Sequence, residues 1–379
     1  MKTDQDALNR MIGELARNSQ AFAATTAADR RDMVVELLKT VAAVTDDWVA
    51  SGCRAKGAPS PIVAAEEIIN GPAVTFRFLQ LTRAALDDLA HGQKPRLPAA
   101  VITDEQGRVK VPILPAKGLF DPLNFLGFRA YARMLPEVTT ENLMGYRAPQ
   151  FAVEPQPGIT LVLGAGNVSS IPLIDVLSKL FHEGQVVLLK VNPVNEYLGP
   201  IFERALAPLM ARGFVRIAYG GGDVGASAIN HPDISSVHIT GSAESHDMIV
   251  WGPPGEERER RKRENSPLLR KPITSELGNV SPWIVVPGKY SARQLAFQAE
   301  NIAASITNNV SFNCVATKLI VTNRDWPDRD RFLDLVDHFL RDTPRRKAYY
   351  PGAVERYRRF AGDRAATSEC DEETLPWTL

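Results

Sequence analysis

The stretch GITLVLGAGN, residues 158–167, decides the fold. Residues 159–163 form an apolar and β-branched run that ends in a glycine-rich turn, and an apolar segment over 172–182 follows it. A short apolar run bounded by turn residues predicts a buried strand, and the longer segment after it predicts a helix. The stretch is therefore expected to open a strand–turn–helix unit.

The same pattern recurs along the next 80 or so residues. Strands are expected over 185–191, 215–219 and 236–240, with a helix over 197–212. Short strands that alternate with helices predict a doubly wound parallel sheet of the α/β class. Such a sheet binds its ligand at the carboxyl ends of the strands.

The flanking segments predict further elements. Apolar residues recur at helical spacing from about Thr25 to Leu89, which indicates a block of amphipathic helices. Residues 108–114 predict an extended segment that crosses a surface, and the alternation over 150–153 predicts an edge strand or an exchange arm between subunits. A strand over 282–286 and a helix over 291–307 are expected later in the chain.

Composition and charge exclude several classes of protein. Lysine plus arginine equals aspartate plus glutamate, 44 against 44, so no overall field attracts nucleic acid. The sequence contains no run of about 18 apolar residues, the length that a membrane-spanning helix requires. The three cysteines, Cys53, Cys314 and Cys370, lie far apart, which favours a reducing, cytoplasmic compartment over a disulfide scaffold. The six scattered histidines predict no metal site.

Two glycine-rich turns follow expected strands. One is Gly164-Ala165-Gly166, and the other, GGGDVG over residues 220–225, fits the pattern GxGxxG with Gly222 and Gly225 as its last two glycines. No well-placed acidic residue stands about 20 positions further on, as a dinucleotide fingerprint requires. A phosphate contact and a plain tight turn before a helix both remain open for this second turn.

Four short segments in fixed order precede Cys314, which stands in an Asn-Cys-Val sequence before an apolar run. They are Gly166-Asn167-Val168, Lys190-Val191-Asn192-Pro193, Ile239-Thr240-Gly241-Ser242 and Ser275-Glu276-Leu277-Gly278-Asn279. In these segments the sequence resembles the aldehyde dehydrogenase superfamily, over roughly residues 30–325. Each segment alone is a weak signal, and their common order makes the resemblance fairly specific.

The resemblance implies catalytic roles for three residues. Cys314 would attack an aldehyde as the thiolate, Asn167 would donate a hydrogen bond to the resulting oxyanion, and Glu276 would activate the water that hydrolyses the thioester. Read without the resemblance, Cys314 is a small buried hydrophobe, Asn167 a helix cap and Glu276 a surface charge.

The resemblance also implies a nicotinamide dinucleotide. Lys190 would hydrogen-bond the adenosine ribose, while Gly241 and Ser242 would place backbone N–H groups against the pyrophosphate. Pro193 stands where many members have a glutamate that disfavours a 2′-phosphate. The choice between NAD and NADP therefore stays open.

The sequence departs from the family pattern in other places. His246 replaces a second glycine of the pyrophosphate segment, Asn279 replaces the second glycine of the glutamate motif, and Ser311-Phe312 replaces a Gly-Gln pair, whereas Asn309 keeps its place. The His246 imidazole is a candidate to meet the phosphates. No Phe-Gly-Pro segment occurs in the residues after Cys314, so the resemblance implies a C-terminally truncated member with an incomplete α/β catalytic domain.

These observations lead to one functional hypothesis with alternatives. The chain is expected to oxidise an aldehyde to a carboxylic acid with NAD or NADP, without nucleic-acid or membrane partners. An acylating aldehyde dehydrogenase, an acyl-CoA reductase and a catalytically silent dinucleotide-binding paralogue remain as alternatives. The family implies a homo-oligomer, and self-association is expected to be impaired. The expected division is a helical part of the cofactor domain over 1–132, a bridging arm over 133–157, a dinucleotide-binding domain over 158–276 and an incomplete catalytic domain over 277–379.

Overall fold

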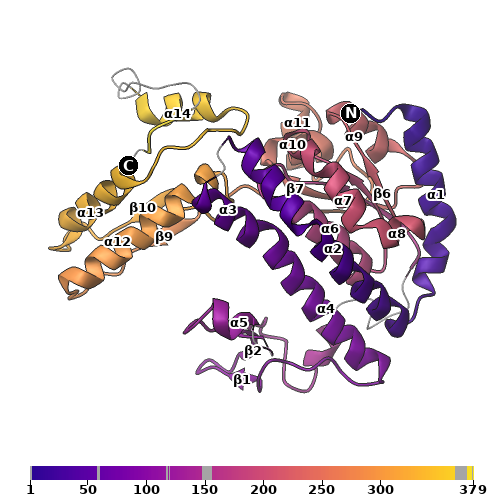
Figure 1. Ribbon diagram of the computed structural model, residues 1–379, viewed down its shortest axis with the longest axis horizontal. Coiled ribbons are helices and arrows are strands. Elements are labelled where there is room, and N and C mark those ends of the chain that lie inside the picture. The colour runs from indigo at the N-terminus through magenta and orange to yellow at the C-terminus, as the bar shows by residue number, and fades with distance from the viewer. Residues whose placement is uncertain are drawn as a thin grey trace.

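The computed structural model describes residues 2–57, 60–116, 118, 120–146, 156–362, 374–377 and 379. It contains a sheet domain, a small antiparallel sheet and a C-terminal lobe, which occupy different regions of Figure 1. The strand expected over 150–153 lies outside the described residues.

The sheet domain has five parallel strands in the order β6-β5-β4-β7-β8. Every residue of β5 is buried, as expected for a parallel sheet with both faces covered. This confirms the doubly wound α/β fold. The strands span Ile159–Leu163 (β4), Val186–Lys190 (β5), Val215–Ala218 (β6), Ser236–Gly241 (β7) and Ile273–Leu277 (β8).

Helices from two parts of the chain cover this sheet. Those between the strands are α6 (Ile171–Phe181), α7 (Gly199–Ala205), α8 (Ala207–Ala211), α9 (Gly222–Asn230), α10 (Ala243–Val250) and α11 (Glu256–Arg263), with the short 3₁₀ helix η4 (Pro193–Leu198) before α7. The N-terminal helices are α1 (Gln5–Ala23), α2 (Ala27–Ala55), α3 (Pro61–Ile68) and α4 (Val74–Ala90), and a π-helical turn, η1 (Ile69–Ala73), joins the last two. Both α1 and α6 contact β4 and β5, so one apolar core joins the sheet to the N-terminal helices.

The small sheet differs from the expectation of a single extended crossing segment. Strand β2 (Val109–Leu114) pairs in antiparallel fashion with β1 (Ile102–Thr103) on one side and β3 (Ala130–Arg133) on the other. A short helix, α5 (Phe120–Asn124), and a 3₁₀ turn, η2 (Leu143–Tyr146), complete the segment. The pairing supplies hydrogen-bond partners that a lone extended segment would lack.

The C-terminal lobe has its own core. Helices α12 (Ala292–Thr307) and α13 (Arg329–Asp342) pack together beside the parallel pair β9 (Pro282–Ile284) and β10 (Leu319–Val321). The 3₁₀ turn η5 (Asn308–Ser311) follows α12 directly, and α14 (Ala353–Ala361) follows the lobe. The segment before α14 leads back from the lobe toward the N-terminal helices (Figure 1).

Candidate active site

One cleft of about 1500 Å³ opens at the carboxyl ends of the parallel strands and reaches the C-terminal lobe. The six residues to which the resemblance assigns a catalytic or cofactor-binding role all line it, and so do two glycines of the turn over residues 220–225. They are Asn167, Lys190, Gly222, Gly225, Gly241, Ser242, Glu276 and Cys314. Asn167 and Cys314, which are 147 positions apart in the sequence, thus line the same cavity.

The Cys314 side chain is partly exposed in this cleft, whereas Cys53 is buried in α2. The Cys314 Sγ atom lies 3.6 Å from Asn313 Oδ1, and the Ser281 hydroxyl donates to the Cys314 carbonyl at 2.7 Å. Lys318 lies close by; burial lowers the pKa of its ammonium, while its electrostatic interaction with Cys314 raises it.

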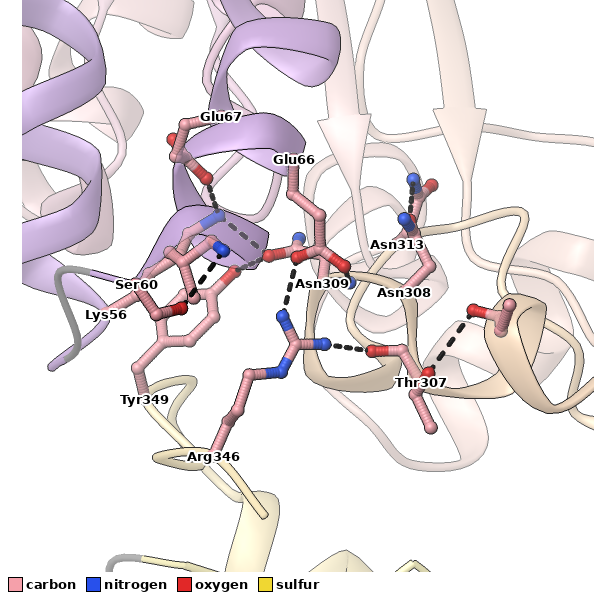
Figure 2. A network of polar contacts seen from close by, with 12 residues as sticks. Lys56, Ser60, Glu66, Glu67, Thr307, Asn308, Asn309, Asn313, Arg346 and Tyr349 are labelled. Atoms are coloured by element: carbon pink, nitrogen blue, oxygen red, sulfur yellow. Dashed lines mark hydrogen bonds and ion pairs between the residues drawn. The ribbon is translucent and has the colours of Figure 1, made fainter. Parts of the chain in front are cut away.

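The turn that leads to Cys314 has an unusual backbone. Asn309, Val310 and Ser311 have φ values of 50°, 55° and 62°, in the left-handed region. Asparagine tolerates this region, but a β-branched valine does so only under strain. Such strain persists where the surroundings hold it in place. Figure 2 shows the polar network that surrounds Asn309.

Asn167 is bonded to this turn rather than to a helix end. Its Nδ2 atom donates to the Phe312 carbonyl at 2.8 Å, and its own carbonyl accepts from Asn309 Nδ2 at 2.8 Å. The N-cap of α6 is Ser170, so the helix-cap interpretation of Asn167 is wrong. A primary amide has two N–H donors. The bond to Phe312 uses one of them.

Glu276 lies in β8 with its side chain exposed to the cleft. Within the described ranges its carboxylate has no hydrogen-bond or ion-pair partner. The carboxylate is therefore free to accept a proton from a molecule in the cleft.

The other end of the cleft has features that suit a dinucleotide. Lys190 ends β5 and is only 8% exposed, and its ammonium has no partner among the residues that the structure describes. Burial lowers its pKa, and the carboxylates of Glu196 and Asp223 partly restore it. A buried cation without a partner is costly, so a ligand that accepts its hydrogen bonds would relieve that cost.

Two helices begin at this end of the cleft. Gly222 starts α9, and a Cβ atom added there would meet no atom within 4 Å. A ligand can therefore come close to the protein backbone at this position. Ser242 caps α10, and its hydroxyl accepts from the Ser245 N–H at 3.1 Å. Helix N-termini attract anions such as a pyrophosphate.

The expectation for His246 is wrong. This residue does not line the cleft, and its Nδ1 atom lies 3.2 Å from Asp247 Oδ1. The residues of α10 that line the cleft, Glu244, Ser245, Met248 and Ile249, follow helical spacing along one face, and position 246 lies outside that face.

Two further cleft residues were not predicted by any sequence pattern. Tyr350 and Arg356 come from the segment after α13 and line the cleft. Both contact Phe312, with ring centroids 5.4 Å apart for Tyr350 and the Arg356 guanidinium 5.7 Å above the ring. The only sequence cue is the Tyr349-Tyr350 pair, and a tandem aromatic pair does not by itself indicate where it packs.

The sequence matches no protein-family model and no curated protein. Its structure resembles a putative aldehyde dehydrogenase from Burkholderia cenocepacia, with a TM-score of 0.61 and 16% identity over 95% of this chain and 63% of that one. The chain has the aldehyde dehydrogenase fold. Aldehyde dehydrogenase C from Pseudomonas syringae, solved with NAD⁺ and octanal, gives a TM-score of 0.56 and 14% identity over 88% of this chain and 54% of that one.

A third structure with this fold is the NADP-dependent glyceraldehyde-3-phosphate dehydrogenase from Bacillus halodurans, solved with NADP. It has a TM-score of 0.56 and 15% identity over 90% of this chain and 58% of that one. The chain thus spans less than two thirds of the length of each of these three structures. At such identities the likeness establishes the aldehyde dehydrogenase fold and leaves the chemistry to the residues of the cleft.

Membrane-spanning helices and metal-binding clusters are both absent from the described ranges. None of the helices there combines the length and apolar character needed to cross a bilayer. Those same ranges hold no group of three or more histidine, cysteine, aspartate or glutamate side chains arranged for a metal ion.

Proposed function

We propose that this chain oxidises an aldehyde to a carboxylic acid with NAD or NADP, as the aldehyde dehydrogenase fold suggests. The observation that carries the proposal is that Cys314, Asn167 and Glu276 all line one cleft at the carboxyl ends of the sheet. Structures with the same fold have been solved with NAD⁺ and with NADP. In this proposal the sheet domain binds the dinucleotide, and the C-terminal lobe carries Cys314.

The cleft residues fit such a dinucleotide. The unpartnered Lys190 would hydrogen-bond the adenosine ribose, and the N-termini of α9 and α10, with Gly222, Gly225, Gly241 and Ser242, would face the phosphates. When bound, the nicotinamide supplies a hydride acceptor. Either NAD or NADP is compatible with this proposal.

The protein residues supply the remaining chemistry. The Cys314 thiolate adds to the carbonyl carbon to form a thiohemiacetal, and the free N–H of Asn167 stabilises the oxyanion. Loss of hydride leaves a thioester on Cys314. Glu276 accepts a proton from water as that water attacks the thioester, which releases the carboxylic acid and the free thiol.

The first test separates the two halves of this cycle. Glu276→Gln is expected to retain a burst of about one reduced cofactor per active site but to lower steady-state turnover by roughly 10²–10⁴-fold, because only thioester hydrolysis needs the base. Rapid-mixing absorbance of the reduced nicotinamide measures both phases. Glu264→Gln, at the exposed C-cap of α11, is the matched control.

Three outcomes are informative. Unchanged turnover in Glu276→Gln rules out Glu276 as the general base. Turnover that depends on added coenzyme A supports the acylating alternative. Binding of NAD or NADP by the unmodified chain without any burst indicates a silent dinucleotide-binding protein.

A second test addresses Lys190. Lys190→Met is expected to weaken NAD or NADP binding by roughly 10–100-fold, the effect of losing hydrogen bonds from a charged donor. The same change should leave the melting temperature of the free protein equal or higher, since burial disfavours the charged ammonium. Calorimetric titration and thermal unfolding measure the two effects, with exposed Lys289→Met as control. Tight binding by Lys190→Met would remove this residue from the cofactor site.

A further inference from the structure

We propose that Tyr349 and Lys56 are positioning residues for Cys314, and that they act by holding Asn309 in the strained turn that leads to it. This inference rests on the proposed function, because it assigns the network a role in placing the nucleophile against Asn167. Figure 2 shows the two side chains converging on Asn309 from opposite parts of the chain.

Asn309 is the centre of the network. It is 1% exposed, and its Oδ1 atom accepts from Lys56 Nζ at 2.7 Å and lies 3.1 Å from the Tyr349 hydroxyl. Its Nδ2 atom donates to the Asn167 carbonyl, and its backbone N–H donates to Glu66 Oε1 at 3.2 Å. These bonds fix the position of Asn309, the first residue of the left-handed turn. The path of the next five residues, which end at Cys314, depends on that position.

Lys56 supplies a buried positive charge to this centre. It extends from the end of α2, is 7% exposed and forms an ion pair with Glu67 of α3, which is 1% exposed. Its Nζ atom also lies 5.1 Å above the Tyr349 ring. The N-terminal helices therefore reach the turn through a charged donor, and such a hydrogen bond is stronger than a neutral one.

Tyr349 connects the two loops that the chemistry needs. Its hydroxyl lies 3.0 Å from the Asn167 carbonyl and 3.1 Å from Asn309 Oδ1, so one proton is shared between two acceptors. Burial raises the pKa of the phenol, which keeps this donor protonated. The distance between the Asn167 loop and the cysteine turn thus depends on one side chain of the C-terminal segment.

Arg346 anchors that segment to the same place. Its guanidinium bonds Glu66 Oε2 at 2.7 Å and also donates to the Thr307 carbonyl, at the end of α12. Glu66 in turn accepts from the Asn309 backbone. Residues from 56–67, 167, 307–309 and 346–349 therefore meet around the turn, and among these contacting residues only Asn167 lines the cleft.

The test removes the Tyr349 hydroxyl. Tyr349→Phe is expected to lower kcat by roughly 10–100-fold, since a nucleophile displaced by about 1 Å loses on that order of rate. The KM for NAD or NADP should stay within about twofold, because the cofactor residues are untouched. A merely structural role would instead lower the melting temperature and leave kcat per folded molecule unchanged.

Tyr290→Phe is the matched control. The Tyr290 hydroxyl also donates to a backbone carbonyl, that of Val286 at 2.8 Å, but it lies in the loop before α12 and outside the cleft. It should lose no turnover. Wild-type kcat in Tyr349→Phe overturns the proposal.

A second readout separates this proposal from the proposed function. The rate at which iodoacetamide modifies Cys314, followed by peptide mass spectrometry, needs no turnover and is expected to fall about threefold or more in Tyr349→Phe as the thiol moves from its partly exposed place in the cleft. If the unmodified chain oxidises no aldehyde, the proposed function fails, and an unchanged modification rate then overturns the positioning role as well. Should Tyr349→Phe not fold, the double variant Lys56→Met/Glu67→Met provides the same two readouts.

Discussion

Replacement of Cys314 by serine is expected to lower the kcat for aldehyde oxidation by about 10³-fold or more, because a serine hydroxyl is almost entirely un-ionised near neutral pH and is a much weaker nucleophile than a thiolate. The Cys314 sulfur lies beside Asn313 Oδ1 and near Lys318, directly after the strained turn, and serine is expected to keep this geometry nearly unchanged. The loss should therefore appear in the chemical step. Steady-state absorbance of the reduced nicotinamide, at saturating NAD or NADP, measures it.

The matched control is Cys53→Ser. This thiol is buried in α2 and lies outside the cleft, so the change should lower the melting temperature but keep kcat within about twofold. Binding of NAD or NADP to Cys314→Ser should match that of the unmodified chain. Turnover that survives in Cys314→Ser would mean that the sulfur is not the nucleophile, and the covalent route would have to be abandoned.

The central sheet was predictable because one signal dominates it. Strands such as β4 and β5 are continuous apolar runs, which only a sheet covered on both faces can bury. The family resemblance, rather than this pattern, indicated the site residues on its carboxyl edge, which end a strand or stand directly after one. Lys190, Gly241 and Ser242 are of this kind.

The network around Asn309, in the turn before Cys314, was not predictable from the sequence. Its members come from distant segments that follow no common periodic pattern. The left-handed turn includes Val310, a residue type whose preferences oppose that backbone, so no local rule indicates it. Lys56 and Glu67 lie on either side of a helix break and pair only after α2 and α3 pack together. Tyr349 reaches Asn167 over 182 residues of sequence.

The Lys56–Glu67 pair leads to the largest expected effect on stability. Lys56→Met removes the cation and leaves a carboxylate that is 1% exposed; within the described chain its Oε2 atom has no partner even when Lys56 is present. Breaking a buried pair from one side costs about 3–5 kcal/mol. The free energy of unfolding, from urea titration with the slope m held comparable, should fall by that amount.

The double variant Lys56→Met/Glu67→Met distinguishes charge burial from loss of packing. Two apolar side chains of similar length replace the ion pair, and such replacements are often close to neutral, so most of the lost stability should return. Turnover should not return with it, because Asn309 Oδ1 then keeps only the Tyr349 hydroxyl. A double variant that regained both stability and kcat would show that the pair serves packing alone. Recovery of stability without kcat would show that the ammonium of Lys56 is needed where it meets Asn309, five residues before Cys314.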